Sequence, residues 1–129
     1  MDKLTASLED YLEVICNYTD EHHNLRAIDI SKKLKVSRAS VTEALKKLAD
    51  KGLIKYDRYE TIALTPKGAQ IGQTVVSKHN ILQDFFEKTL GLSKEEASAN
   101  ACKIEHVITE NAFNKISDFL NKWEYNEKL

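Results

Sequence analysis

The stretch AIDISKKLKVSRASVTEALKKLAD, residues 27–50, decides the fold of this chain of 129 residues. Its first eight residues, 27–34, predict a short helix, and the two residues after them predict a tight turn. Ser37 is a favourable N-cap for a second helix over residues 38–50. Two short helices joined by a tight turn are typical of a helix-turn-helix.

The second helix of this pair has a buried side and an open side. Val41, Leu45 and Leu48 recur at helical spacing and are expected to face the core. In a helix-turn-helix, the N-terminal end of the second helix reads base edges in the major groove of DNA. The residues left on its open side are Arg38, Ala39, Ser40, Thr42, Glu43, Lys46 and Lys47.

A β-hairpin is expected directly after this helix. Gly52 is a plausible C′ residue, and apolar residues alternate over 54–56 and again over 62–64. A hairpin in this position is a wing, and Arg58 near its tip could reach a phosphate or the minor groove. We assign base reading to Arg38, Ser40, Thr42 and Glu43, and phosphate contacts to Ser37, Lys46, Lys47 and Arg58.

Charge divides the chain in the same way. Residues 26–58 hold ten basic and four acidic side chains, whereas the remainder holds nine basic and sixteen acidic ones. A basic segment on an acidic body suggests binding to a polyanion, although a solvated surface explains the same pattern. No apolar run is long enough to span a membrane, and the two distant cysteines favour a reducing compartment, so we expect a cytoplasmic protein.

Four more helices are predicted outside this segment. An amphipathic helix over 7–19, capped by Ser7, precedes it, and a long helix from Thr65-Pro66 to Gly91 follows it. A capping box at Ser93 begins the next helix, and a last one over 110–123 is expected to bury Phe113, Ile116, Phe119 and Leu120. We therefore expect a mostly α protein with a winged helix-turn-helix domain over residues 1–65 and a helical domain over 66–129. Helices with little else to cover them usually pair with a second subunit, which suggests a homodimer.

Candidate metal ligands lie on three of the predicted helices. Cys102, Glu105 and His106 stand at i, i+3 and i+4, and so would share one helix face. Thiolate, carboxylate and imidazole groups bind transition metals, but three ligands are too few for a closed site. The full set that the chain offers is Asp10, Glu13, His79, Cys102, Glu105 and His106. A cation would relieve the repulsion among the carboxylates and join the first helix to the helices behind it.

Five short motifs in order along the chain resemble those of one family. They are Leu8-Glu-Asp-Tyr-Leu-Glu13, Val36-Ser-Arg-Ala-Ser-Val41, Leu64-Thr-Pro-Lys-Gly68, Lys78-His79 and Cys102-Lys-Ile-Glu-His106. This order is similar to that of the diphtheria toxin repressor and manganese transport regulator family of metal-activated bacterial repressors. The resemblance implies a winged-helix domain, a helical dimerisation domain and repression of metal-uptake genes when metal is plentiful.

The resemblance is mixed at the level of individual ligands. Asp10 and Glu13 resemble the carboxylate ligands that the manganese-sensing branch has on its first helix. Cys102 resembles the cysteine that precedes the Glu-His pair in the iron-sensing branch. The iron branch's ancillary site uses His79 with a Glu and a His, and this chain has Gln83 and Ser98 there. The resemblance leads us to expect no SH3-like third domain of the kind found in the iron branch. We expect Mn²⁺ or Fe²⁺ as the activator, with Zn²⁺ or Co²⁺ possible in vitro, and expect Cys16 to lie in the core.

The sequence thus predicts a metal-activated repressor rather than an enzyme. A homodimer would place two recognition helices about 34 Å apart on a palindromic double-stranded operator. One alternative is a winged-helix regulator that binds DNA without metal. The other is a metallohydrolase, which the absence of an HExxH pattern or spare general base disfavours.

Overall fold

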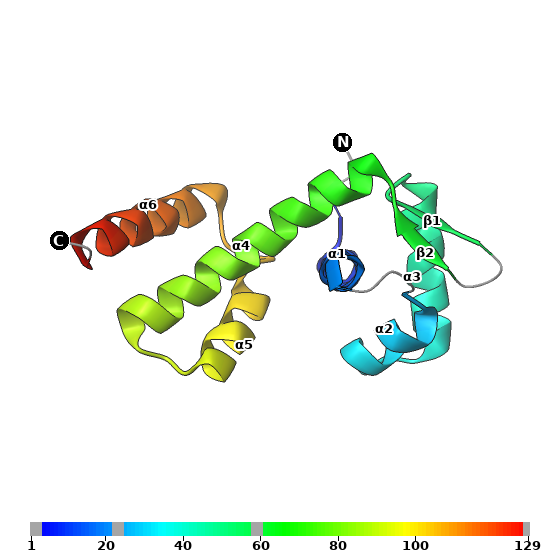
Figure 1. The fold of residues 1–129 in the computed structure, drawn as a ribbon, viewed down its shortest axis with the longest axis horizontal. Helices are drawn as coiled ribbons and strands as arrows, with labels where there is room; N and C mark the ends of the chain where they lie inside the picture. Colours follow the sequence, from blue (N-terminus) through cyan, green and yellow to red (C-terminus); the bar gives the residue numbers. More distant parts are fainter. Residues whose placement is uncertain (1–3, 22–24, 58–60, 128–129) are drawn as a thin grey trace. The chain divides into compact units, whose positions relative to one another are not determined.

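A computed structural model describes residues 4–21, 25–57 and 61–127 of the chain, drawn in Figure 1. Among these residues the fold is mostly helical, as expected. In chain order the elements are α1 (Ala6–Glu21), α2 (Ala27–Leu34), α3 (Arg38–Asp50), β1 (Ile54–Tyr56), β2 (Ile62–Leu64), α4 (Pro66–Leu90), α5 (Lys94–Ile104) and α6 (Glu110–Glu127). None of these helices is long and apolar enough to cross a membrane.

Two compact units make up the chain, and each is described by itself. The first is Met1–Val76 and the second is Ser77–Leu129, so that the division falls inside the 25-residue helix α4. The assignment of residues 1–65 and 66–129 to separate domains stays a prediction.

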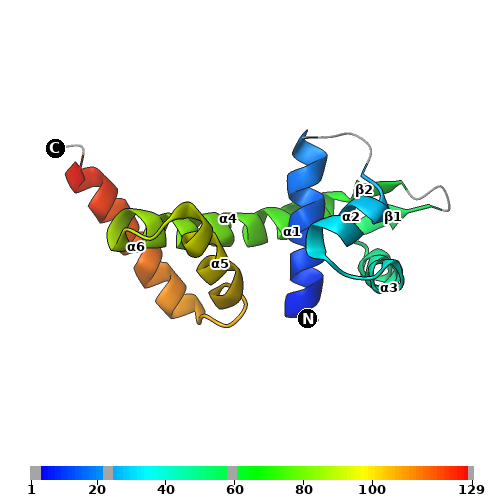
Figure 2. The same ribbon diagram turned by 90° about the horizontal axis from the view of Figure 1, so that it is seen from below.

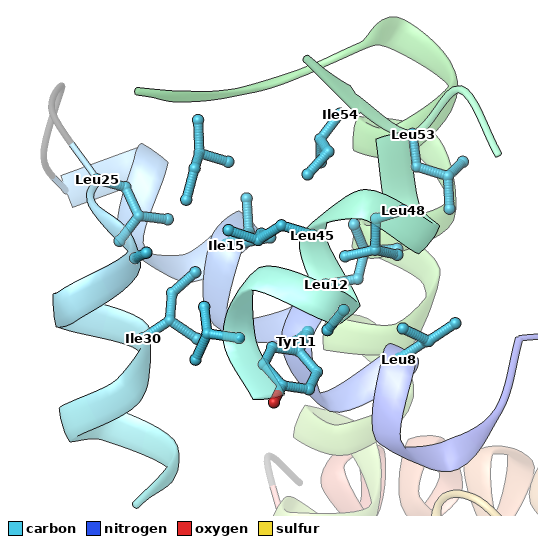
Figure 3. Packing of buried hydrophobic residues seen from close by; sticks show 14 residues of the cluster. Leu8, Tyr11, Leu12, Ile15, Leu25, Ile30, Leu45, Leu48, Leu53 and Ile54 are labelled. Atoms are coloured by element: carbon cyan, nitrogen blue, oxygen red, sulfur yellow. The ribbon is translucent and has the colours of Figure 1, made fainter. Parts of the chain in front are cut away.

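The core of the first unit lies between α1, α2 and α3, as Figure 3 shows in close view. Leu12 and Ile15 of α1 are fully buried against Ile30 of α2 and Leu45 of α3. The predicted stripe of α3 is confirmed, because Val41, Leu45 and Leu48 are all fully buried. Burial of an aliphatic side chain contributes roughly 1.5–3 kcal/mol, so this shared core fixes α3 to α1.

The turn between α2 and α3 has the geometry that a helix-turn-helix needs. Lys35 adopts the left-handed conformation, with φ 57°, and its N–H donates to the Ser31 carbonyl. The hydroxyl of Ser37 accepts a hydrogen bond from the N–H of Ser40 at 3.1 Å, which confirms Ser37 as the N-cap of α3. The two helices and their turn therefore match the sequence-based expectation.

The wing is an antiparallel pair of three-residue strands. Ile54 pairs with Leu64 and Tyr56 with Ile62, and β1 packs against α3, beside which both strands lie in Figures 1 and 2. Gly52 precedes the hairpin with φ 75°, the left-handed conformation expected of a C′ glycine. Arg58, the residue assigned to the wing tip, lies outside the described residues.

Several helix ends differ from the expected ones, since α1 runs over Ala6–Glu21 rather than 7–19 and α6 over Glu110–Glu127 rather than 110–123. The cap of α1 is Thr5 rather than Ser7, because the Thr5 hydroxyl accepts from the N–H of Leu8 at 3.1 Å and Ser7 lies inside the helix. Helix α5 ends at Ile104, so Glu105 is its C-cap and His106 lies in the turn that follows. Glu105 keeps helical backbone angles, and its N–H still donates to the Ala101 carbonyl, which preserves the expected direction of its side chain.

The first part of α4 completes the first unit by close approach to its neighbours. A side chain at Gly68 would overlap the backbone of Leu53, and a side chain at Gly72 would overlap the sulfur of Cys16. Cys16 is buried, as expected for a core residue. Its sulfur therefore occupies the volume that the missing side chain of Gly72 leaves beside α1.

In the second unit, α5 and α6 both contact the later part of α4. Phe85 of α4 makes an edge-to-face contact with Phe119 of α6, and Phe119 in turn stacks on Trp123. Lys88 donates a hydrogen bond to Glu124 at 2.7 Å, and this bond raises the pKa of Lys88. Phe119 was expected in the core, but half of its surface is exposed, and this aromatic row opens onto an apolar groove.

Replacing Gly72 with Ala tests the contact between α1 and α4. A Gly→Ala change inside a helix usually stabilises by about 1 kcal/mol, but overpacking here is expected to lower the free energy of unfolding by about 1–3 kcal/mol. The Cys16→Ala/Gly72→Ala variant is expected to be more stable than the sum of its single changes, as urea denaturation of all four proteins can measure. A Gly72→Ala variant more stable than the wild type would contradict this packing.

Candidate metal centre and nucleic-acid interface

Glu105 lies at the end of the buried face of α5. Ser93 caps this helix by accepting a hydrogen bond from the N–H of Glu96 at 3.1 Å. Ala97 and Ala101 are fully buried, and Glu105 follows them at the same four-residue interval. The helix therefore directs Glu105 inward rather than to solvent, and only 2% of its side chain is exposed.

Two histidines flank the Glu105 carboxylate, one on each oxygen. Nδ1 of His79, from α4, lies 3.3 Å from one oxygen, and Nε2 of His106 lies 3.6 Å from the other. His79 occupies the inward side of α4, between the buried Val75 and Leu82. Both imidazoles are themselves largely covered, with 13% and 11% of the side chain exposed.

Cys102 adds a sulfur to this cluster. Its Sγ lies within 4.8 Å of a Glu105 carboxylate oxygen, although the residue as a whole is exposed. The second unit thus brings together four of the six predicted ligands, namely His79, Cys102, Glu105 and His106.

The two residues that replace the iron branch's ancillary ligands make other contacts. Gln83 donates a hydrogen bond to Glu87 at 3.1 Å, on its own helix. The Ser98 hydroxyl lies 3.5 Å from Nε2 of His79, so this position still faces the histidine but offers it a neutral hydroxyl. We infer no ancillary site from these two residues.

The electrostatics of the cluster favour a cation. Neither carboxylate oxygen of Glu105 has a hydrogen-bond partner among the described residues, and both are buried. A buried carboxylate costs several kcal/mol unless it is hydrogen-bonded, paired with a charge or bound to a metal. Two imidazoles, a carboxylate and a thiol are ligands that suit Mn²⁺, Fe²⁺, Co²⁺ or Zn²⁺, so the donors fit a divalent transition metal.

The two remaining predicted ligands lie in the first unit. Asp10 and Glu13 are three residues apart on α1, and both are half-buried. They flank the side of the helix that carries Leu12 and Ile15 into the core. The first unit therefore presents a pair of carboxylates on the helix against which α3 packs.

The candidate DNA-reading face of α3 is open to solvent for most of its residues. Thr42 is half-buried, whereas the other six candidates on this helix are exposed: Arg38, Ala39, Ser40, Glu43, Lys46 and Lys47. Glu43 and Lys47 form an ion pair at 3.4 Å, with 72% and 59% of their side chains exposed. A pair this exposed contributes little to stability, so both groups can exchange partners readily.

Three of these residues line a hollow that the sequence analysis did not anticipate. Ser40, Glu43 and Lys47 face the N-terminal part of α1 across a hollow of about 430 Å³, which Thr5, Ser7, Tyr11 and Lys51 also line. Burial, and then the charge of Glu43, raise the pKa of the Tyr11 hydroxyl. The spacing of Ser40, Glu43 and Lys47 at i, i+3 and i+7 could have shown that they share a face, but the approach of α1 is a tertiary contact.

Two family models match the chain. One describes the N-terminal DNA-binding domain of iron-dependent repressors and matches residues 3–62. The other describes the metal-binding and dimerisation domain of iron-dependent repressors and matches residues 65–128. Together they span nearly the whole sequence.

Named relatives are similar over most of the chain. The HTH-type transcriptional regulator MntR of Geobacillus kaustophilus is 35% identical over 124 residues, covering 96% of this chain and 87% of the relative. An uncharacterised HTH-type transcriptional regulator of Methanocaldococcus jannaschii is 31% identical over 122 residues, covering 94% of this chain and 98% of the relative.

Solved structures show the same fold. The manganese regulator SloR superimposes with a TM-score of 0.77 at 26% identity, covering 93% of this chain and 55% of that one. A manganese-dependent transcriptional repressor in complex with manganese gives a TM-score of 0.79 at 25% identity, covering 88% of this chain and 52% of that one. The chain therefore spans about half the length of these two proteins.

Ser37 offers a test of the local structure on which the α3 face depends. Because its hydroxyl caps the helix, Ser37→Ala is expected to lower the free energy of unfolding by about 1 kcal/mol. Ser37→Asp keeps a side-chain oxygen at the cap and is expected to retain wild-type stability in the same urea titration. Equal stability of the Ala variant and the wild type would show that the cap contributes nothing.

Proposed function

The chain belongs to the iron-dependent repressor family, and from this premise we propose that it represses metal-uptake genes when Mn²⁺ or Fe²⁺ is plentiful. It is a metal-responsive DNA-binding regulator rather than an enzyme. The observation that carries the metal dependence is the buried Glu105 carboxylate, with an imidazole beside each of its oxygens. A repressor acts where the chromosome lies, so the proposal places the protein in the cytoplasm.

The proposed ligands of the metal are Asp10, Glu13, His79, Cys102, Glu105 and His106. Four come from the second unit and the two carboxylates come from α1, which is why the metal is proposed to join α1 to the second unit. The bound cation supplies positive charge that offsets the repulsion among these carboxylates. The oxygen and nitrogen donors favour Mn²⁺ or Fe²⁺, and the thiol of Cys102 favours Fe²⁺ over Mn²⁺.

Helix α1 is proposed to transmit the metal signal to DNA. Leu12 and Ile15 of α1 share one buried core with Leu45 of α3. A protein core is close-packed, so α3 follows α1 when α1 is held in place. Fixing Asp10 and Glu13 therefore fixes the direction in which the recognition helix points.

We propose that the DNA-binding form is a homodimer on a palindromic operator. The second unit carries the dimerisation region by its family match. Its aromatic row of Phe85, Phe119 and Trp123, of which Phe119 is exposed, is a candidate contact. Two recognition helices about 34 Å apart would enter successive major grooves. Arg38, Ser40, Thr42 and Glu43 are the proposed base readers, next to Ala39, and Ser37, Lys46, Lys47 and Arg58 are the proposed phosphate contacts.

The free energy of metal binding is large enough to shift the protein from a DNA-incompetent to a DNA-competent population. A ligand at a hundredfold excess over its Kd stabilises the state that it binds by about 2.7 kcal/mol. Two equivalent sites in a dimer would give about 5.4 kcal/mol, close to the roughly 5.5 kcal/mol that changes a population from 1:99 to 99:1. One modest site per subunit is therefore enough.

Glu105→Gln and His106→Ala test the metal site. Both variants are expected to lose metal-dependent DNA binding while keeping their far-ultraviolet circular dichroism and their oligomeric state, because the changes remove ligands and no apolar core. Glu95→Gln, an exposed acidic residue at the start of the same helix, is the matched control. If both ligand variants still bind DNA in response to metal as the wild type does, the proposed metal site is wrong.

Lys46→Ala tests the phosphate contacts. Since Lys46 is exposed on α3, its loss is expected to weaken binding to all DNA sequences alike and to reduce the slope of log K against log[salt] by about one. Anisotropy titrations at several salt concentrations measure both quantities. A loss confined to one base position would contradict a phosphate role for this lysine.

A further inference from the structure

Lys35, in the turn between α2 and α3, holds a backbone conformation that costs free energy. Its φ is 57°, and among the described residues it is the one residue other than glycine with a positive φ. A side chain in this left-handed region crowds the backbone, so glycine and, less often, asparagine usually occupy such positions at helix ends. The chain therefore keeps a lysine where glycine would fit the backbone better.

The hydrogen bonds of the turn impose this conformation on whichever residue stands at position 35. The Ser31 carbonyl accepts from the N–H of Lys35 and, at 3.2 Å, from the N–H of Val36. The Ser31 hydroxyl donates to the Val36 carbonyl at 2.6 Å, and Val36 packs against the core of the first unit. These contacts fix the backbone around position 35 and use no side-chain atom of the lysine. The fold therefore gives no reason for a lysine here.

The Lys35 side chain is exposed and has no opposite charge to balance it inside the protein. Within the described residues it takes part in no ion pair, unlike Lys47, which pairs with Glu43 at 3.4 Å. Residues 30–42 hold no acidic side chain and four basic ones, which are Lys32, Lys33, Lys35 and Arg38. All four are exposed. A surface of one charge sign such as this one suits an anionic partner.

We propose that Lys35 contacts a backbone phosphate of the bound DNA, in addition to the phosphate contacts proposed above. In a helix-turn-helix the first helix crosses the sugar-phosphate backbone and the second enters the major groove. Lys35 stands between these helices, two residues before the Ser37 cap, so it lies where the chain passes from the backbone into the groove. Its ammonium group would replace a counterion of the phosphate. This inference rests on the proposed function, because it takes α3 to be the helix that reads DNA.

One substitution at this position is expected to change stability and DNA binding in opposite directions. Lys35→Gly removes the crowding in the left-handed conformation and is expected to raise the folded-to-unfolded ratio by about fivefold, as measured by urea denaturation. The same change removes one phosphate contact per subunit. It is expected to reduce the slope of log K against log[salt] by about 0.9 per subunit, and hence to weaken binding about eightfold per subunit at 0.1 M salt.

DNA binding is measured on the full-length protein by fluorescence anisotropy, at saturating Mn²⁺ and several salt concentrations. The probes are a duplex that the wild type selects from a random library and an unrelated duplex of the same length. Since phosphate contacts carry no sequence information, the loss in Lys35→Gly is expected to be the same on both duplexes.

Three further variants separate charge from backbone freedom. Lys35→Asn also tolerates the left-handed conformation but lacks the extra freedom of glycine, so it is expected to lose affinity as Lys35→Gly does. Lys35→Arg keeps the positive charge and is expected to keep the wild-type affinity and salt slope. Lys94→Gln, which removes an exposed positive charge from α5, is the matched control and is expected to bind DNA as the wild type does.

The other outcomes overturn the phosphate contact. Wild-type affinity and salt slope in both Lys35→Gly and Lys35→Asn would do so, and so would a loss in Lys35→Gly alone, which flexibility of the turn explains. A Lys35→Gly variant less stable than the wild type would show that the lysine is not held there at a cost. An equal loss in Lys94→Gln would show that net charge, rather than position, sets the affinity. If the wild type binds DNA equally well with Mn²⁺ and with a chelator, the proposed function fails, whereas the salt slopes still decide the role of Lys35.

Discussion

The buried carboxylate of Glu105 is the constraint on which the rest of the second unit depends. The four-residue repeat of Ala97, Ala101 and Glu105 places an acidic group where α5 otherwise buries alanines. His79 and His106 lie beside its two oxygens, so that a charge which is costly in isolation becomes the centre of a cluster of metal-binding groups. Helix α5 ends at Ile104, and the turn that follows places the His106 imidazole beside the same carboxylate.

Helix α1 has the corresponding position in the first unit. One side of it, through Leu12 and Ile15, belongs to the core that orients α3, and its flank carries Asp10 and Glu13. The same helix therefore contributes to the placement of the recognition helix and to the proposed ligand set. In the proposed function, α1 is the element that metal binding and DNA reading have in common.

Most of the first unit could be predicted from local sequence signals. The Ser37 cap, the apolar spacing of Val41, Leu45 and Leu48, and the two alternating strands are short-range patterns, and all were confirmed. The predictions that differ from the structure concern either two residues that compete to cap one helix or contacts between helices. Thr5 and Ser7 are both able to cap α1, and the sequence does not rank them.

The exposure of Phe119 and the hollow between α1 and α3 depend on how helices pack, which periodicity within one helix does not encode. The pairing of His79 with Glu105 needs the same long-range information, and there the order of motifs along the chain supplied it.

The central claim is that metal occupancy controls DNA binding, and one titration of the wild-type protein tests it most directly. DNA affinity is followed anaerobically as Mn²⁺ is added and then removed with a chelator. If the competent population rises from 1% to 99%, the apparent affinity increases by about a hundredfold and returns to its starting value with the chelator. Equal affinity with and without the chelator, for Mn²⁺ and for Fe²⁺ alike, would contradict the account.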